Sequence, residues 1–205
     1  MTEQTKLTLL ALAVVFAACS SGGTPGASPS GGTPGASPSG SATLQNWPAG
    51  QTGTIYFFIR NTTYSFSAPV NSNGQFSYNL PTPPSSALSP VGTPPCSGVT
   101  ISNPSARLAS LQIEAQVGSG PRRPVRIASS RPPTLPYTSA TLSYSDSAVS
   151  INGSCPASGS SPATTFNASF AQGWNWLVTT VSSTNSASIS SSNTLPNNLN
   201  WYYDY

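Results

Sequence analysis

The chain contains no histidine, and its single lysine, Lys6, lies close to the N-terminus. A Ser-His-Asp or Cys-His site needs an imidazole as its base, and a Ser-Lys dyad or a Schiff base needs a lysine. The region after the N-terminal segment therefore lacks the residues for these kinds of catalysis. A metal site built from cysteine and histidine is excluded for the same reason.

Acidic residues are almost as scarce, with only Glu114, Asp146 and Asp204 after the first few positions. Glycoside hydrolysis generally uses two carboxylates about 5–10 Å apart, and no motif pairs these three. No phosphate-binding glycine loop or calcium loop is present either. We therefore expect a protein that is not an enzyme, with no metal and no cofactor.

Charged residues make up only 5% of the chain, and the net charge is +3. This excess is too small to indicate nucleic acid as a partner. Serine, threonine, asparagine, glycine and proline replace the charged residues, a composition that suits short strands and many turns.

No apolar run is long enough to span a bilayer, which takes about 20 residues as a helix. The longest, Leu7–Ala18, has the length and position of the apolar region of a secretory signal peptide, which we place at 1–18. Two small residues, Ala17 and Ala18, close it directly before Cys19.

The segment Phe16-Ala17-Ala18-Cys19 resembles the lipobox of bacterial lipoproteins, with Phe16 where that family usually has leucine. The resemblance implies that the Cys19 thiol receives a diacylglycerol, that cleavage precedes Cys19, and that the protein is membrane-anchored through lipid. Ser20 then implies the outer membrane, if the organism has two membranes. The alternative is an ordinary cleaved signal peptide followed by an incidental cysteine.

Residues 19–43 are predicted to be a disordered linker. The nonapeptide SGGTPGASP occurs twice in tandem, at 21–29 and 30–38, and has no apolar periodicity. A flexible linker of this length has a typical reach of roughly 25 Å. A motif recognised by a partner is the alternative reading of the repeat.

Residues 44–205 are predicted to form one all-β domain, an antiparallel sandwich or a barrel, because short stretches of period-two hydrophobicity recur between turn signals. The predicted strands are 55–59, 63–68, 75–80, 111–117, 142–144, 149–151, 165–170, 174–178 and 199–204. Asn71-Ser72-Asn73-Gly74 is predicted to be a hairpin turn. The C-terminal WYYDY suits a last strand, and the alternative is a C-terminal aromatic signal of outer-membrane proteins.

Two segments carry a resemblance to known architectures. TIYFFI at 54–59 with FSAPVNSNGQFSYNLP at 66–81 resembles the early strands of transthyretin-like and carboxypeptidase-regulatory-like sandwiches. NASFAQGWNWLV at 167–178 is similar to a Gly-Trp-Asn hairpin of bacterial envelope lipoproteins. The resemblance implies a β-sandwich and no specific activity.

Cys96 and Cys155 remain once Cys19 is assigned to lipid. In an exported domain, two remaining cysteines in proline- and glycine-rich surroundings predict a disulfide. A reactive thiol is the alternative, but no neighbour that would stabilise a thiolate is visible in the sequence.

Two groups of residues are candidates for ligand binding. Arg122, Arg123 and Arg126, with Arg131 following, could bind phosphates or carboxylates of lipid headgroups, lipopolysaccharide or an acidic polymer. Trp174 and Trp176 could stack on sugar rings. The structural alternatives are a solvated proline-rich loop for the arginines and core packing for the tryptophans.

The sequence thus predicts a non-catalytic, lipid-anchored protein of the cell envelope whose β-sandwich has a structural or interaction role, with other envelope proteins or polysaccharide as partners. A module that binds carbohydrate or envelope polymers is the second hypothesis, and an enzyme is the third.

Overall fold

The computed structural model describes residues 38–159 and 161–204, and this part of the chain is all-β, as predicted. The one helical turn in it is the short 3-10 helix η1 at Ser85–Ala87. The strands, in chain order, are β1 (Ser39–Gln45), β2 (Gly53–Phe58), β3 (Ser65–Val70), β4 (Gln75–Asn79), β5 (Ser89–Pro90), β6 (Val99–Ile101), β7 (Arg107–Ser110), β8 (Gln112–Val117), β9 (Arg123–Ala128), β10 (Tyr137–Ser145), β11 (Val149–Cys155), β12 (Ala163–Phe170), β13 (Gly173–Ser183), β14 (Ser186–Ser192) and β15 (Asn200–Tyr203).

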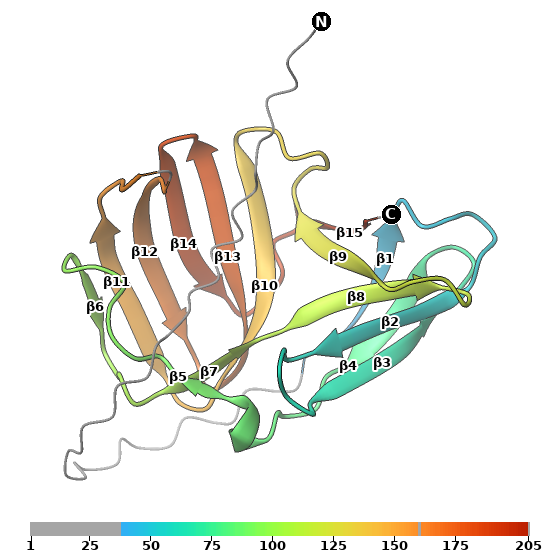
Figure 1. Ribbon diagram of the computed structural model, residues 1–205, viewed down its shortest axis with the longest axis horizontal. Coiled ribbons are helices and arrows are strands. Elements are labelled where there is room, and N and C mark those ends of the chain that lie inside the picture. The colour runs from blue at the N-terminus through green and yellow to red at the C-terminus, as the bar shows by residue number, and fades with distance from the viewer. Residues whose placement is uncertain (1–37, 160, 205) are drawn as a thin grey trace, which may run out of the picture.

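The strands form one continuous, strongly curved sheet with the order β3-β2-β8-β9-β10-β13-β14-β12-β11-β6. Figure 1 shows its two parts, a broad sheet from β10 to β6 and a smaller sandwich built from the first strands. β9 joins them, because it pairs with β8 at its start, with β10 at its end and with β15 along 125–128. Two strand pairs, β1 with β15 and β12 with β14, are parallel, so the sheet is mixed rather than purely antiparallel.

The sandwich consists of two facing leaves, β3-β2-β8 and β4-β1-β15. Aromatic rings meet between them: the Phe57 ring of β2 lies 6.4 Å from the Phe76 ring of β4 and 6.4 Å from the Trp201 ring of β15. Trp201 also lies 5.3 Å from Phe76 and 6.2 Å from Trp176 of β13. These contacts join the two leaves and the broad sheet into one main core.

The predicted hairpin at 71–74 is wrong in its pairing, although the turn itself is present. Asn71 Oδ1 accepts the backbone N–H groups of Asn73 and Gln75, and Gly74 adopts a φ of 76°. The flanking strands separate, however, because β3 pairs with β2 and β4 pairs with β1. The turn is therefore an arch that carries the chain from one leaf to the other.

The folded region begins earlier than predicted, because β1 starts at Ser39, inside the segment expected to be linker. Residues 39–43 pair with 75–79 of β4, and Gly40 sits against the Tyr78 ring, where a larger side chain would meet its hydroxyl. A serine- and glycine-rich segment carries no strand signal of its own. Its backbone completes the edge of a leaf whose apolar residues come from β4.

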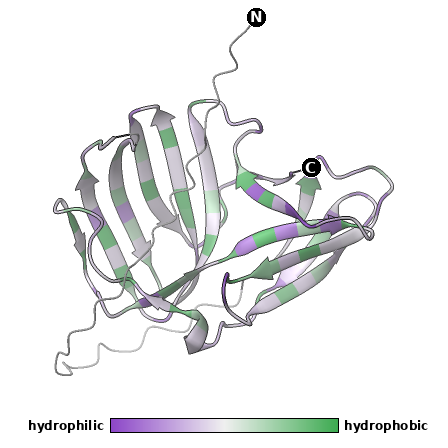
Figure 2. Ribbon diagram, viewed as in Figure 1, coloured by the Kyte–Doolittle hydropathy of each residue, from purple (hydrophilic) through white to green (hydrophobic). Residues whose placement is uncertain are grey.

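In the broad sheet, the face of β10 and β13 that carries Leu142 and Trp176 contributes to the main core. The opposite face has a smaller core at one end, formed by Val91, Ala106, Val149, Ala168 and Phe170. Figure 2 shows the alternation of apolar and polar positions along these strands that such packing requires. Strand β14 was not predicted, because its serines hide an alternation in which Ala187 and Ile189 are buried.

Candidate ligand-binding site

The structure places Trp174 and Trp176 in the main core, so the prediction that they stack on sugar rings is wrong. Their residues are 8% and 4% exposed, respectively. The Trp174 ring packs edge-on against Tyr144 at 5.4 Å, and Trp176 packs against Trp201. Alternate positions of a strand point to the same face, so Trp174 and Trp176 of β13 both point to the face that packs on the sandwich.

The arginines, in contrast, lie at the surface, but not on the proline-rich loop that was the alternative expectation. Arg123 and Arg126 belong to β9, and Arg122 directly precedes it. The Arg122 guanidinium stacks on the Tyr56 ring of β2, with its central carbon 3.6 Å from the ring centroid. This cation–π contact fixes the side chain against the outer face of the sandwich.

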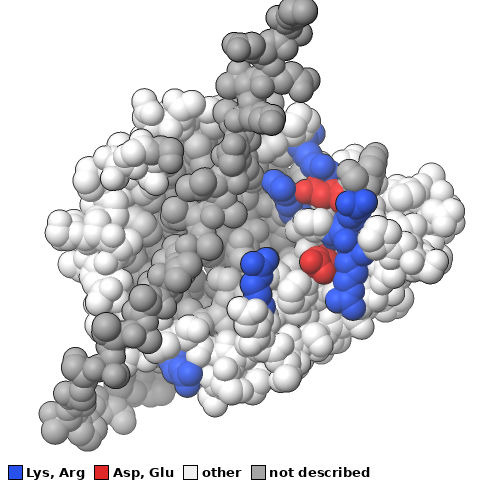
Figure 3. Space-filling model, in the orientation of Figure 1, with Lys and Arg blue, Asp and Glu red and all other residues white. Residues whose placement is uncertain are grey.

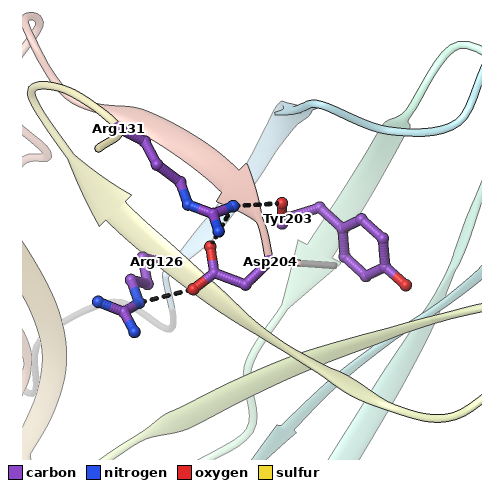
Figure 4. A network of polar contacts seen from close by, with 4 residues as sticks. All are labelled: Arg126, Arg131, Tyr203 and Asp204. Atoms are coloured by element: carbon purple, nitrogen blue, oxygen red, sulfur yellow. Dashed lines mark hydrogen bonds and ion pairs between the residues drawn. The ribbon is translucent and has the colours of Figure 1, made fainter. Parts of the chain in front are cut away.

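The most organised part of the surface is a network around Asp204, drawn in Figure 4. Arg126 Nε lies 2.7 Å from Asp204 Oδ2, and Arg131 Nη1 lies 2.7 Å from Oδ1 of the same carboxylate. Arg131 Nη1 also donates a hydrogen bond to the backbone carbonyl of Tyr203, at 3.0 Å. The Asp204 side chain is only 11% exposed, whereas those of Arg126 and Arg131 are 48% and 32% exposed.

Sequence reasoning named Asp204 only as one of three acidic residues without a pairing motif and missed its contacts with the arginines. The missing signal is three-dimensional: β15 pairs antiparallel with β9, with Tyr202 opposite Arg126, so the residue after β15 reaches the two arginines. Figure 3 shows that basic side chains gather on this face around few acidic ones. The arrangement makes the face locally positive.

The remaining acidic residues do not form a pair. Asp146 Oδ1 accepts the backbone N–H of Arg107 and the hydroxyl of Ser147, which gives it a structural role at the end of β10. Glu114 lies seven residues beyond Arg107 along the extended β7–β8 segment, about 20 Å away at roughly 3.3 Å per residue. Glu114 and Asp146 are therefore not brought together as a carboxylate pair, whereas Glu114 and Asp204 both lie beside Pro124 of β9. Within residues 38–159 and 161–204, no group of three potential ligands is arranged to hold a metal ion.

Cys96 and Cys155 form a disulfide, with their Cα atoms 5.8 Å apart. The bond ties the loop before β6 to the end of β11, at the outer edge of the broad sheet. The backbones approach closely beside it: a Cβ atom on Gly153 would lie 2.0 Å from the carbonyl oxygen of Gly98. Glycine is required there because the two strands leave no room for a side chain.

The predicted signal peptide, Cys19 and most of the predicted linker lie outside the described residues. In the part of the chain that is described, no helix has the length and apolar character needed to cross a bilayer. Comparison with protein-family models, curated proteins and solved structures gave no match.

Proposed function

We propose that the protein is a lipid-anchored component of the bacterial cell envelope, in which a non-catalytic β domain has a structural or interaction role. The disulfide between Cys96 and Cys155 is the observation that carries the proposal. Disulfides persist in oxidising compartments outside the cytosol and are rare within it. A domain with a disulfide therefore agrees with an N-terminal segment that has the pattern of an export signal.

The order of features along the chain supports an anchor rather than simple secretion. An apolar run ends at Cys19, a glycine- and proline-rich repeat follows, and the first strand begins at Ser39. Two or more acyl chains on Cys19 would hold the protein stably at a membrane, and about twenty residues would then separate the lipid from the domain. Ser20 favours the outer membrane in a bacterium with two membranes.

Metabolic labelling with palmitate tests the anchor. We expect the label to enter the natural chain and to be absent from Cys19→Ser, with the natural chain in the membrane fraction and the variant released from it. Cys96→Ser with Cys155→Ser is the matched control, because it removes the two disulfide-bonded cysteines and leaves residue 19 unchanged. Label that persists in Cys19→Ser, or that depends on residues 96 and 155, would refute the proposal.

Binding to an envelope polymer is a second candidate function, favoured by the arginines of β9 and its flanks. Trp174 and Trp176 do not support polymer binding, because both are buried. The exposed guanidinium groups of Arg123 and Arg126 do, because they are fixed on a strand rather than carried by a loose loop.

A further inference from the structure

A small hollow lies beside the Asp204 network, at the junction of β9, β10 and β15. It has a volume of about 20 Å³. The residues that line it come from the strands and from the loop between β9 and β10, and they are Arg126, Ala128, Ser130, Arg131, Pro133, Tyr137 and Tyr202. A space of this size holds about one water-sized group, so it can take one oxygen atom of an anionic group, while the rest of the ligand lies outside it.

The charges around the hollow do not cancel. Arg126 and Arg131 share one carboxylate, that of Asp204, which leaves one positive charge in excess. Arg126 contacts Asp204 through Nε, and Figure 4 shows its two terminal nitrogens directed away from that carboxylate. Its side chain is 48% exposed, so these donors are accessible to a ligand.

The guanidinium groups are also held in place before any ligand binds. Asp204 and the Tyr203 carbonyl fix Arg131, and Asp204 fixes Arg126. Side chains that are already ordered lose little conformational entropy on binding, and a guanidinium fork matches the oxygens of a carboxylate or a phosphate. The nearby Arg122 and Arg123 add long-range attraction for an anion.

We propose that this hollow, named here the β9 anion site and formed by Arg126, Arg131, Ser130, Tyr137 and Tyr202, binds the oxyanion of an acid-substituted sugar. The oxyanion is a carboxylate or a phosphate ester, and its oxygens accept hydrogen bonds from the Arg126 terminal nitrogens. Tyr137 and Tyr202 line the hollow, and tyrosine rings can offer apolar surface to the sugar that carries the anion. A recessed site between strands suits one substituent of a polymer better than the flat surface of a membrane. The site deepens the polymer-binding function and does not depend on the lipid anchor.

Titration of the detergent-purified full chain with glucose 6-phosphate, glucuronate and glucose, followed by NMR of the arginine Nε–H signals, tests the proposal. We expect the two acidic sugars to shift the Arg126 and Arg131 signals in a saturable manner, and glucose to leave them unchanged. Arg126→Gln should weaken binding about tenfold, because it removes charge-assisted hydrogen bonds. The affinity of Arg126→Lys should lie between those of the natural chain and Arg126→Gln, since lysine keeps the positive charge and lacks the paired donors of a guanidinium group.

Arg60→Gln is the matched control, because it removes one exposed positive charge from the turn after β2, away from the hollow. We expect it to leave the affinity for the acidic sugars unchanged, and thermal melting of each variant establishes that it is folded. Equal weakening by Arg60→Gln and Arg126→Gln would show unspecific attraction and overturn the site. So would the absence of saturable shifts, or shifts produced by vesicles of acidic phospholipid and not by the acidic sugars. Binding of acidic sugars at this site does not require lipid on Cys19. A failed palmitate-labelling experiment would therefore refute the anchor and leave the anion site standing, and the converse also holds.

Discussion

At the residue scale, Tyr64 shows how burial makes the stability of the fold depend on pH. Its hydroxyl donates to the Pro81 carbonyl at 2.7 Å, and burial raises its pKa from 10.0 to about 12. The folded state therefore keeps a proton that the unfolded state loses above pH 10. The contribution of Tyr64 to stability is complete below about pH 10 and is lost as the pH rises towards 12.

Urea unfolding between pH 8 and pH 11 measures this effect. We expect the natural chain to lose stability at the alkaline end, and Tyr64→Phe to show a shallower fall after starting from a lower value near pH 8. Burial also raises the pKa of Tyr78, so the variant retains part of the slope. A slope unchanged by Tyr64→Phe would assign the pH dependence to other groups.

A second prediction at the residue scale concerns Gly153, whose backbone lies very close to that of Gly98. Gly153 has a φ of 132°, and its missing Cβ would collide with Gly98. We expect Gly153→Ala to destabilise the protein by at least about 3 kcal/mol, because the strands would have to move apart. Chemical denaturation measures the loss.

Gly118 is the matched control for this substitution. It also has a positive φ, of 50°, but nothing lies within 4 Å of its Cβ position. Gly118→Ala should therefore cost only about 1 kcal/mol of backbone strain. Similar losses for the two variants would mean that backbone conformation, and not the close contact with Gly98, sets the requirement for glycine at residue 153.

At the scale of elements, β15 is the strand that closes the sandwich. It pairs with β1 on one side and β9 on the other, and Trp201 contacts rings from β2, β4 and β13. We expect Trp201→Ala to lower the free energy of unfolding by about 3–5 kcal/mol, since it empties the centre of the core. Urea unfolding followed by circular dichroism measures the change.

Tyr202→Ala supplies the comparison on the same strand. Its side chain points to the outer face and is only half-buried, so its removal should cost much less than removal of Trp201. Equal costs would show that the strand's pairing, rather than the aromatic cluster, stabilises this part of the fold.

The elements also show why the sequence predicted some parts of the fold and not others. Strands with alternating aromatic and polar residues, such as β4 and β12, were predicted close to their observed positions. Strands β1, β9 and β14 were missed, because serine, glycine, proline and arginine mask their apolar positions. The arch at 71–74 was read as a hairpin, because a turn sequence does not determine which strands pair beyond it.

The candidate site illustrates the same limit. Arg122, Arg123 and Arg126 were recognised as a group because they lie close together in a sequence that has few arginines. The partnership with Asp204 depends on β15 returning to β9 from the far end of the chain, which local patterns do not encode. The sequence left core packing of Trp174 and Trp176 open as an alternative to sugar stacking, and the packing of the sandwich on the broad sheet decides in its favour.

At the scale of the whole molecule, the disulfide closes a long loop of the chain. The bonded residues are 59 positions apart in the sequence. In the chain-entropy model, such a crosslink stabilises the folded state by about 4 kcal/mol, because it restricts the unfolded chain. We expect Cys96→Ala with Cys155→Ala to lower the free energy of unfolding by about that amount in guanidinium titrations. A loss well below 1 kcal/mol would mean that the bond contributes little to the free energy of unfolding.

The proposed function joins three features: export would permit the disulfide to form, and lipid on Cys19 would hold the domain at the envelope. Mass spectrometry of the protein isolated from its native cells without reductant tests this account most directly. We predict a chain that begins at Cys19, carries a thioether-linked diacylglycerol on that residue and has Cys96 joined to Cys155. A chain that retains Met1 and has three free thiols would contradict it.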